Sequence, residues 1–426
     1  MRLRPGRVRS GSVREGRPRS GSVREGPVRS GSVRLGRVAV VLGLLETFGP
    51  ISMDLYLPLL PRLAADLGTS ESLAQATMSA CMLGLALGQL VVGPLSDRVG
   101  RRRPLLAGVG LFAVLSVVCA VTPSIELLLA ARFLQGLCGS AGIVVALAVA
   151  RDLTEGVELV RLLAMLTTVG ALAPIVAPVV GGQLALVMGW RGIFLVLAGI
   201  GGGLFLLALL ALPESLPGPA RRGDGGFRDL GVLARDRLFL CFLVVGACGG
   251  TAFFTYLASI SFVAQGGFGL SPQWFSVCFA ANAVMSVVGA QVNRAVVRRF
   301  GPARMYVVGT TATALAAVTM VVAAVLDAGI LLLVPLGLVM LTSGGSTSNG
   351  SALALASHGS RAGTAAALLG TSAFAVGPVL APLVSLNGTS PLSMSLTMAA
   401  AHGCAAAIVW VAVRPRLRAP AVTGGR

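Results

Sequence analysis

Twelve apolar runs constrain the fold of this chain more than any other feature of its sequence. Each approaches the roughly 20 residues that a helix needs to cross the hydrocarbon of a bilayer. Only 12% of the residues are charged, about half the share usual in soluble domains. We therefore expect an all-α polytopic membrane protein with twelve transmembrane helices. The runs cover residues 38–60, 74–94, 104–122, 125–149, 162–186, 191–212, 238–261, 273–293, 305–326, 329–350, 363–386 and 392–413.

The arginines between these runs gather on one side. With a cytoplasmic N-terminus, only Arg62 and Arg191 fall in segments on the outer side. Cytoplasmic loops of membrane proteins are enriched in basic residues, so we expect a multi-pass protein of the cytoplasmic membrane with both termini cytoplasmic. The net charge of +18 then reflects orientation, and nucleic-acid binding is not expected. The inner segments contain Arg98, Arg101 to Arg103, Arg151, Arg161, Arg294, Arg298, Arg299, Arg304, Arg361 and the tail from Arg414.

Polar segments divide the chain into parts. Residues 1–36 repeat a ten-residue Arg/Gly/Ser unit without an apolar face, which predicts a disordered basic tail. Such a tail could bind anionic lipids, but we favour a natural translation start further downstream. The polar loop at 216–237 separates an N-terminal half at 37–215 from a C-terminal half at 238–414, and a short cytoplasmic tail, 415–426, follows. Two six-helix halves around a midplane site are one layout of secondary transporters.

Two carboxylates stand inside the first apolar run. Glu46 and Asp54 are eight residues apart, which on a helix is a rise of ~12 Å and a rotation of ~80°. Because charges within a bilayer usually face a polar cavity or a partner, we expect both acids to line one cavity. Pro50 leaves the Glu46 carbonyl without its helical donor, which predicts a bend. The alternative is that both acids lie near helix ends and touch water.

Arg132, in the fourth run, is the only cation inside a span. An uncompensated arginine in lipid is costly, so we expect it to pair with a first-run acid or to face a wet cavity. An ion pair that only fixes helix packing is the alternative interpretation.

The segment GPLSDRVGRRRP (93–104) joins the second and third runs. Gly93 allows close helix contact or a tight exit, and Gly100 allows a turn with positive φ. Asp97 can pair with a nearby guanidinium or a helix N-terminus. The residues that define this motif are Gly93, Asp97, Arg98, Gly100, Arg101 and Arg102.

The fifth run carries prolines at Pro174 and Pro178, followed by Gly181 and Gly182. The prolines leave two carbonyls without helical donors and predict bends. This proline pattern is expected both of a helix that rocks during transport and of a helix with a static kink.

Single polar side chains occur in several runs. A lone amide, phenol or imidazole in a span is more often an interhelical hydrogen bond than a ligand contact. Tyr256, with Phe253 and Phe254, could stack on a planar substrate or face lipid. The set comprises Gln89, Gln183, Tyr256, Asn282, Gln291, Asn349 and His402.

These motifs resemble those of the major facilitator superfamily. Residues 93–104 resemble its G-x-L-[AS]-D-R-x-G-R-R signature, and Arg132 and Gln135 fall in a stretch (131–142) that resembles its R-x-x-Q-G motif. Residues 170–182 resemble the proline/glycine antiporter motif, with Ala177 where most members have glycine. The stretch 53–68 resembles the bicyclomycin/chloramphenicol-resistance type of drug:proton antiporter.

The resemblance implies roles for the matching residues. Asp97 and the loop arginines would latch the two halves on the cytoplasmic side, with Asp97 directed towards the start of the eleventh span. Arg132 would take part in proton coupling, and the first-run acids in protonation or in binding drug cations.

We expect a monomeric, proton-driven exporter of small amphipathic drugs or metabolites in the lipid bilayer, with protons as coupling ion and no other cofactor. No nucleotide-binding G-x-x-x-x-G-K-[ST] loop is present in the sequence, so enzymatic use of ATP is not expected. The alternatives are a proton-coupled symporter that imports a nutrient, and a membrane receptor or scaffold without transport.

Overall fold

The computed structural model describes residues 29–216, 231–356, 358, 362–386 and 388–418, and within them all regular structure is helical. Every expected apolar run falls on a helix, which confirms the predicted fold class. Within the described residues, eleven helical segments are long and apolar enough to cross a membrane, and Leu368–Val384 is a shorter apolar stretch.

The N-terminal half contains the first six spans. Its first span, Val38–Asp66, is broken into several pieces, whereas the next five are single long helices. The elements are α1 (Arg29–Glu46), α2 (Phe48–Asp54), η1 (Leu57–Leu59), α3 (Leu60–Asp66), α4 (Glu71–Val99), α5 (Arg102–Val121), α6 (Ile125–Leu153), α7 (Gly156–Leu184) and α8 (Trp190–Ala211).

The C-terminal half contains the other six. Its first and last spans each include a short π-helical segment. The elements are α10 (Arg237–Phe262), η3 (Val263–Gly267), α11 (Pro272–Phe300), α12 (Pro302–Val325), η4 (Gly329–Leu332), α13 (Leu333–Ala356), α14 (Ala362–Val384), α15 (Pro391–Ile408), η6 (Val409–Val413) and α16 (Arg414–Arg418).

The expected disordered tail needs one correction. Helix α1 begins at Arg29, so residues 29–36 extend the first span and are not part of an unstructured segment. Propagating an existing helix costs little compared with nucleating one, which allows even a polar stretch to continue it. The remainder of that tail, most of the 216–237 loop and residues 419–426 lie outside the described residues.

The second span of each half is built in the same way. Helices α4 and α11 are both 29 residues long, and each begins after a serine, Ser70 or Ser271, whose hydroxyl accepts a backbone N–H of the first turn. Each ends at a glycine with positive φ, 99° at Gly100 and 77° at Gly301. Since glycine adopts this conformation without steric cost, the expected turn at Gly100 is confirmed, and the two halves repeat it.

Small residues set the closest helix contacts in the N-terminal half. A Cβ at Gly84 or Gly88 would overlap the α6 backbone, and one at Gly136 would overlap the Cys81 carbonyl. Gly93, in contrast, has only one ordinary side-chain neighbour, Val144 at 3.8 Å from an added Cβ. The tight crossing of α4 and α6 therefore lies towards the middle of α4, and the close contact considered for Gly93 is not found.

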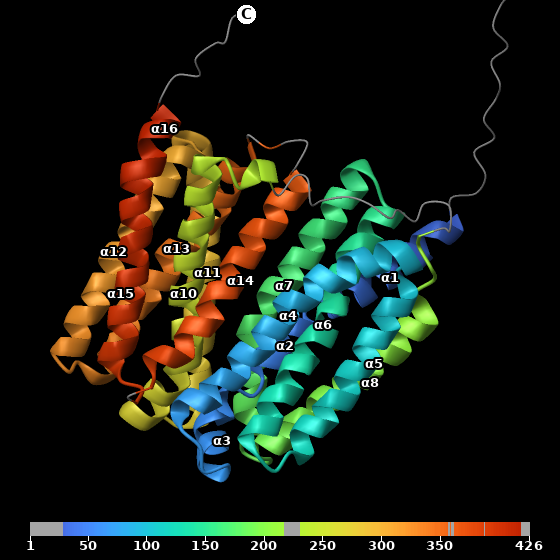
Figure 1. Cartoon of the computed structure of the whole chain (residues 1–426), viewed down its shortest axis with the longest axis horizontal. Helices are drawn as coiled ribbons and strands as arrows, with labels where there is room; N and C mark the ends of the chain where they lie inside the picture. The colour runs from blue at the N-terminus through green and yellow to red at the C-terminus, as the bar shows by residue number, and fades with distance from the viewer. Residues whose placement is uncertain (1–28, 217–230, 357, 359–361, 387, 419–426) are drawn as a thin grey trace, which may run out of the picture.

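The two halves form separate bundles that meet at one end (Figure 1). The start of α1 and the end of α16 lie at the other end, where the bundles diverge. We call these the closed end and the open end. Across the boundary, α4 packs on α14 and α7 packs on α11.

Hydrogen bonds between the halves lie at the closed end. The Ser72 hydroxyl donates to the Pro382 carbonyl (2.8 Å), and the Gln75 amide donates to Thr389 Oγ1 (2.9 Å). Three further bonds add to this seam: Thr389 N to Glu71 Oε2, Ser261 Oγ to the Leu57 carbonyl, and Gln265 Nε2 to the Pro58 carbonyl. The closed end is therefore sealed by direct polar contacts between the halves.

Candidate functional site

The first span is interrupted twice near its two acids. Helix α1 ends at Glu46 and α2 starts at Phe48, close to the bend expected from Pro50, although Thr47 between them keeps helical backbone angles and bonds to Gly43 and Ile51. A second interruption follows Asp54, where Leu55 and Tyr56 precede the short helix η1. The sequence predicted one bend. The second places Asp54 at a helix end, with Tyr56 in the adjoining turn.

Asp54 faces a cavity between the two halves. Its side chain is 5% exposed, and it lines the cavity together with Pro174 of α7 and residues of the C-terminal half. Among the described residues its carboxylate has no hydrogen-bond or ion-pair partner within bonding distance.

Glu46 lies elsewhere. It is not among the residues that line the cavity. It packs against α7, where its Cγ would lie 3.5 Å from a Cβ added to Gly170, and its Oε2 is buried without a hydrogen bond. The expectation that both acids share one cavity is not met in this structure, because only Asp54 is among the residues that line the cavity.

Arg132 is fully buried in the N-terminal half and pairs with neither acid in the described chain. Its guanidinium donates to Gln135 Oε1 and to the Ser52 carbonyl (3.3 Å). It also lies 4.7 Å from the ring centroid of Tyr56 and 5.4 Å from that of Phe194. Aromatic faces attract cations, so these rings and oxygens take the place of the expected carboxylate.

Gln135 orients this arginine. Its Oε1 accepts from Arg132, while its Nε2 donates to Ser116 Oγ at 2.6 Å. Because both ends of the amide are engaged, Gln135 holds Arg132 and does not reach the cavity lining.

The cavity has a volume of about 740 Å³ and belongs mainly to the C-terminal half. This is within the range of about 300–1,000 Å³ typical of small-molecule sites. It extends from Asp54 to residues such as Phe242 and Tyr306, which lie close to the open-end starts of α10 and α12. Aromatic side chains form one part of the wall: Phe253, Phe254, Tyr256, Phe279 and Phe374.

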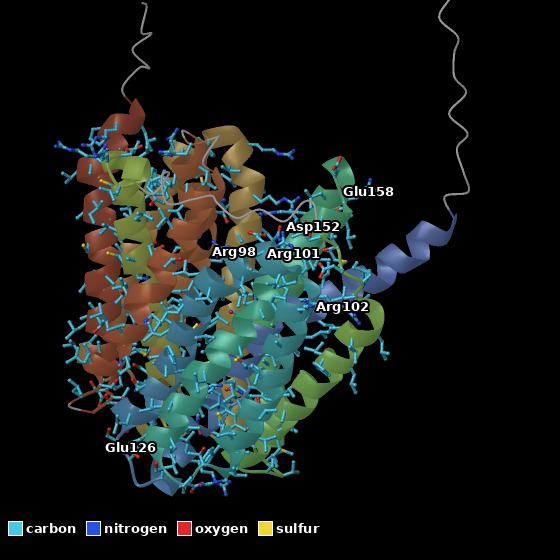
Figure 2. The ribbon with its side chains drawn as sticks, turned by 45° about the vertical axis from the view of Figure 1, so that its right-hand side comes forward. Arg98, Arg101, Arg102, Glu126, Asp152 and Glu158 are labelled. Carbon is cyan, nitrogen blue, oxygen red and sulfur yellow. The ribbon has the colours of Figure 1, made fainter. Side chains whose placement is uncertain are left out.

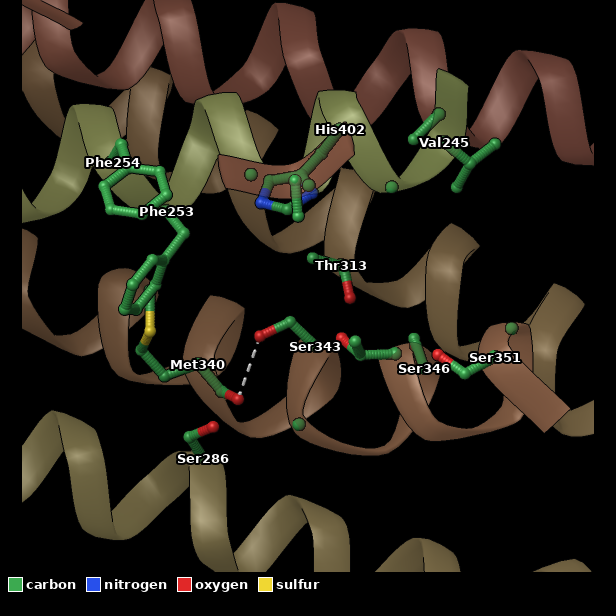
Figure 3. Close-up of a pocket in the computed structure, with 18 of the residues that line it drawn as sticks. Val245, Phe253, Phe254, Ser286, Thr313, Met340, Ser343, Ser346, Ser351 and His402 are labelled. Atoms are coloured by element: carbon green, nitrogen blue, oxygen red, sulfur yellow. Dashed lines mark hydrogen bonds between the residues drawn. The ribbon is translucent and has the colours of Figure 1, made fainter. Parts of the chain in front are cut away.

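Hydroxyl groups form another part of the wall, and the sequence analysis did not select them. Ser343, Ser346 and Ser351 follow one face of α13, and Thr313 of α12 lies nearby (Figure 3). Ser346 and Thr347, which also lines the cavity, follow Ser343 by three and four residues in the stretch TSGGSTSNGS, and this spacing was the available signal, since positions three and four apart share a helix face.

Three of these hydroxyls donate hydrogen bonds to backbone carbonyls of their own helices. Ser343 bonds to the Met340 carbonyl (3.1 Å), Ser346 to the Thr342 carbonyl (3.2 Å) and Thr313 to the Gly309 carbonyl (2.8 Å). A hydroxyl whose proton is engaged still offers acceptor lone pairs. The wall therefore presents acceptors to a molecule in the cavity.

Tyr256 stands beside Asp54 on the other side of the boundary. It is 2% exposed, stacks on Phe279 with ring centroids 5.5 Å apart, and its hydroxyl has no hydrogen-bond partner among the described residues. Of the two interpretations of this aromatic group, cavity lining holds for Tyr256 and Phe254. Phe253 also lines the cavity but is 44% exposed.

Most of the other lone polar side chains do not line the cavity. Asn349 donates to Asn293 Oδ1 at 2.8 Å between α13 and α11, as expected of an interhelical bond. His402 is the exception, because it lines the cavity.

The basic loop forms a polar cluster at the open end of the N-terminal half (Figure 2). Arg101 pairs with Asp97 and with Asp152 (3.0 Å), and its Nη1 also donates to Ser96 Oγ. The Glu214 carboxylate accepts the backbone N–H groups of Arg101 and Arg102 at the start of α5. Burial opposes the charge of Arg101, but the bonds to Asp152 and Asp97 outweigh it and raise the pKa of Arg101 above its ordinary value.

The contacts described above for this cluster lie within the N-terminal half. Within the described residues Asp97 makes no hydrogen bond or ion pair with α14, the helix towards which it was expected to act. Residues 359–361, which precede α14 and border the expected latch, lie outside the described residues, so the latch stays a prediction.

The prolines and glycines of α7 lie where the halves meet. Pro174 lines the cavity, while a Cβ at Gly181 would overlap the Leu55 carbonyl of the broken first span. A Cβ at Gly182 would overlap Ser276 of α11, and the Gly182 carbonyl accepts from Gln273 (3.1 Å). Helix α14 repeats the proline spacing with Pro378 and Pro382, which the sequence analysis missed.

Comparison with known proteins agrees with this architecture. The Major Facilitator Superfamily model matches residues 42–416. A protein of Bacillus subtilis (strain 168), described as an uncharacterized MFS-type transporter, YdgK, is 38% identical over 372 residues, 85% of this chain and 91% of its own length. A bicyclomycin resistance protein homolog of Haemophilus influenzae is 29% identical over 367 residues, 85% of this chain and 92% of its own.

Among solved structures, the nucleoside transporter NupG (D323A mutant) has a TM-score of 0.71 at 12% identity and covers 88% of this chain and 99% of its own, a likeness of fold alone. The resemblance predicted from the sequence motifs is confirmed. The protein is a multi-pass membrane transporter and not an enzyme. The chain belongs to the Major Facilitator Superfamily.

Proposed function

We propose that this transporter exports small amphipathic molecules across the cytoplasmic membrane in exchange for protons. The observation that carries the proposal is Asp54. Of the described residues that line the cavity, it is the one with a formal charge at neutral pH, and it lies beside the boundary between the halves.

The charge and shape of the cavity support this substrate class. Aromatic side chains offer an apolar surface, while hydroxyl acceptors and a carboxylate favour groups that donate hydrogen bonds or carry positive charge. No arginine lines the described cavity and the sequence has no lysine, so an anionic group would find no counter-charge there. Cationic or donor-bearing amphipathic molecules fit best.

Proton exchange follows from competition at one carboxylate. A charged Asp54 would attract the substrate from the open end, which we assign to the cytoplasm because the arginines gather there. After the halves rock, a proton from outside would neutralise Asp54 and release the substrate. Each charge that crosses the membrane gains about 2.3 kcal/mol per 100 mV, enough to bias such an equilibrium.

Two observations bear on the direction of transport. The bicyclomycin resistance homolog of Haemophilus influenzae carries a name that points to drug export. The hydroxyl-rich cavity wall would also suit a polar nutrient, which keeps import by symport as the second candidate.

Flux in proteoliposomes tests both. With the interior acidic, an antiporter should accumulate an aromatic cation such as ethidium inside the vesicles, and a symporter should expel it. A sensitivity panel in cells with and without the gene should show resistance to several amphipathic compounds. Flux that is indifferent to the proton gradient would contradict both assignments.

The orientation has its own test. Thiol labelling of single cysteines should place Arg102 on the cytoplasmic side and Ser70 on the outer side. Labelling of both positions from one side would contradict the assignment of the open end.

A further inference from the structure

His402 is a polar side chain of the cavity to which the transport scheme above gives no task. It lies on α15, and Figure 3 shows its imidazole between Phe254 and Val245 along α10, on the same cavity as Thr313 and Ser346. No described residue forms a hydrogen bond with its ring. The side chain is half-buried, so its ring nitrogens face the cavity without a described protein partner and are open to a molecule bound there.

The groups around His402 define what it could bind. Thr313 and Ser346 donate to the Gly309 and Thr342 carbonyls and keep their lone pairs for the cavity. A neutral imidazole adds one N–H donor and one acceptor nitrogen. Together they offer both hydrogen-bonding roles and no fixed charge, a combination that matches an uncharged hydroxyl or amide.

Among the described residues that line the cavity, Asp54 is the one side chain with a formal charge at neutral pH. Among the described cavity residues the other titratable side chains are Tyr256 of α10, Tyr306 of α12 and Asp54 of the N-terminal half. From Val245 to Tyr256, beside Asp54, α10 rises about 16 Å at 1.5 Å per residue. Figure 3 shows His402 across from the stretch of α10 between Val245 and Phe254.

We propose that His402, with Thr313 and Ser346, forms a subsite that binds an uncharged hydroxyl or amide group of the transported molecule, separately from Asp54. The inference rests on the proposed function and refines it. Cationic substrates depend on Asp54, and neutral hydroxylated substrates depend on His402. Both share the aromatic wall, which includes Phe253 and Phe254.

Two probes separate the subsites. Chloramphenicol has an aryl ring, hydroxyls and an amide but no charge, whereas tetraphenylphosphonium is a permanent cation without hydrogen-bonding groups. We expect His402→Leu to weaken chloramphenicol binding about tenfold, as for the loss of one or two hydrogen bonds, and to leave tetraphenylphosphonium binding unchanged. Asp54→Asn should do the reverse, and His402→Gln, which keeps a donor and an acceptor, should restore part of the chloramphenicol affinity.

A direct measurement is available because the chain has two histidines. The other, His358, pairs with Asp236 at the open end of α10 and does not line the cavity. In the full-length His358→Gln variant, labelled with ¹³C-histidine, the single imidazole signal belongs to His402. It should shift on addition of chloramphenicol and stay in place with tetraphenylphosphonium, while His358→Gln alone should bind both probes as the unmodified protein does.

The outcomes distinguish the subsite from the function. Equal weakening of both probes by His402→Leu would show a packing role and overturn the subsite. Binding of tetraphenylphosphonium without chloramphenicol by the unmodified protein would also overturn it, while leaving the exporter intact. Binding of neither probe would contradict the exporter and the subsite together.

Discussion

The guanidinium of Arg132 lies 4.7 Å from the ring centroid of Tyr56, and the same guanidinium donates to the Ser52 carbonyl. These two contacts stand on either side of Asp54 in the sequence. Arg132 thus holds the broken segment that presents Asp54, without neutralising its carboxylate. Arg132 therefore fixes the position of the segment around Asp54, and the Asp54 carboxylate stays available for a substrate or a proton.

Replacing Arg132 should disturb that unit. Arg132→Met would remove the guanidinium that donates to the buried Ser52 carbonyl and would leave Gln135 Oε1 with only the weak Cys119 thiol donor, at a cost of about 1–3 kcal/mol. We expect a lower melting temperature in detergent and at least tenfold slower transport. Arg132→Lys keeps the charge but loses the planar stacking, so its melting temperature and transport rate should lie between those of the unmodified protein and Arg132→Met. An Arg132→Met variant with normal stability and flux would contradict this role.

Gly181 should tolerate no side chain. A Cβ there would overlap the Leu55 carbonyl next to Asp54, and overpacking of this kind costs about 1–3 kcal/mol. We expect Gly181→Ala to lower both the melting temperature and transport. The matched control is Gly202→Ala in α8, because an added Cβ there meets no atom within 4 Å. Equal behaviour of the two variants would show that the close approach has no consequence.

The open-end cluster predicts an order of effects. Asp97→Asn removes one partner of Arg101 and leaves Asp152 in place, so transport should slow modestly. Arg101→Gln removes both pairs and should slow it more. Since the pKa of Arg101 lies above its ordinary value and Asp152 remains beside it, the guanidinium stays charged in Asp97→Asn, and alkaline pH should not change the effect of that variant. Substrate binding should persist in both variants, because the cluster lies away from the cavity. Loss of binding in well-folded Asp97→Asn would place Asp97 in the site.

The closed end should respond to a covalent lock. In a chain without its native cysteines, Gln75→Cys and Thr389→Cys place thiols where a 2.9 Å hydrogen bond now joins the halves. A short bifunctional maleimide should join them and stop transport, while substrate still binds from the open end. Each single-cysteine variant, treated alike, is the control. Full transport in the cross-linked protein would contradict alternating access through this seam.

Much of this arrangement could be predicted from the sequence. The apolar runs predicted the helices because each crosses the bilayer within one segment. The turn at Gly100 could be predicted because its positive φ is a local requirement. Asp54 could be predicted as a cavity residue because a charge in a span needs a polar surrounding.

Other features depend on tertiary contacts that no local pattern encodes. The partners of Arg132 come from α2, α8 and its own helix, and aromatic rings could replace a carboxylate only once those elements had packed. Glu46 lies against Gly170 of α7 and Asp54 lines the cavity, a difference set by how the first span packs and not by its helical projection. The Glu214 carboxylate, just beyond the end of α8, accepts the backbone N–H of Arg101 next to α5, and no pattern in the sequence predicts this contact.

The central claim is that Asp54 carries the coupling proton in competition with the substrate. Binding of an aromatic cation such as ethidium to the purified protein, measured across pH 5–8, tests it most directly. For the unmodified protein, affinity should fall as the pH falls, because protonation removes the negative charge that attracts the cation. Glu46→Gln should keep this dependence, since Glu46 lies outside the cavity. Asp54→Asn should bind weakly and equally at every pH. An unchanged pH dependence in folded Asp54→Asn, with its loss in Glu46→Gln, would contradict the assignment and make Glu46 the proton carrier.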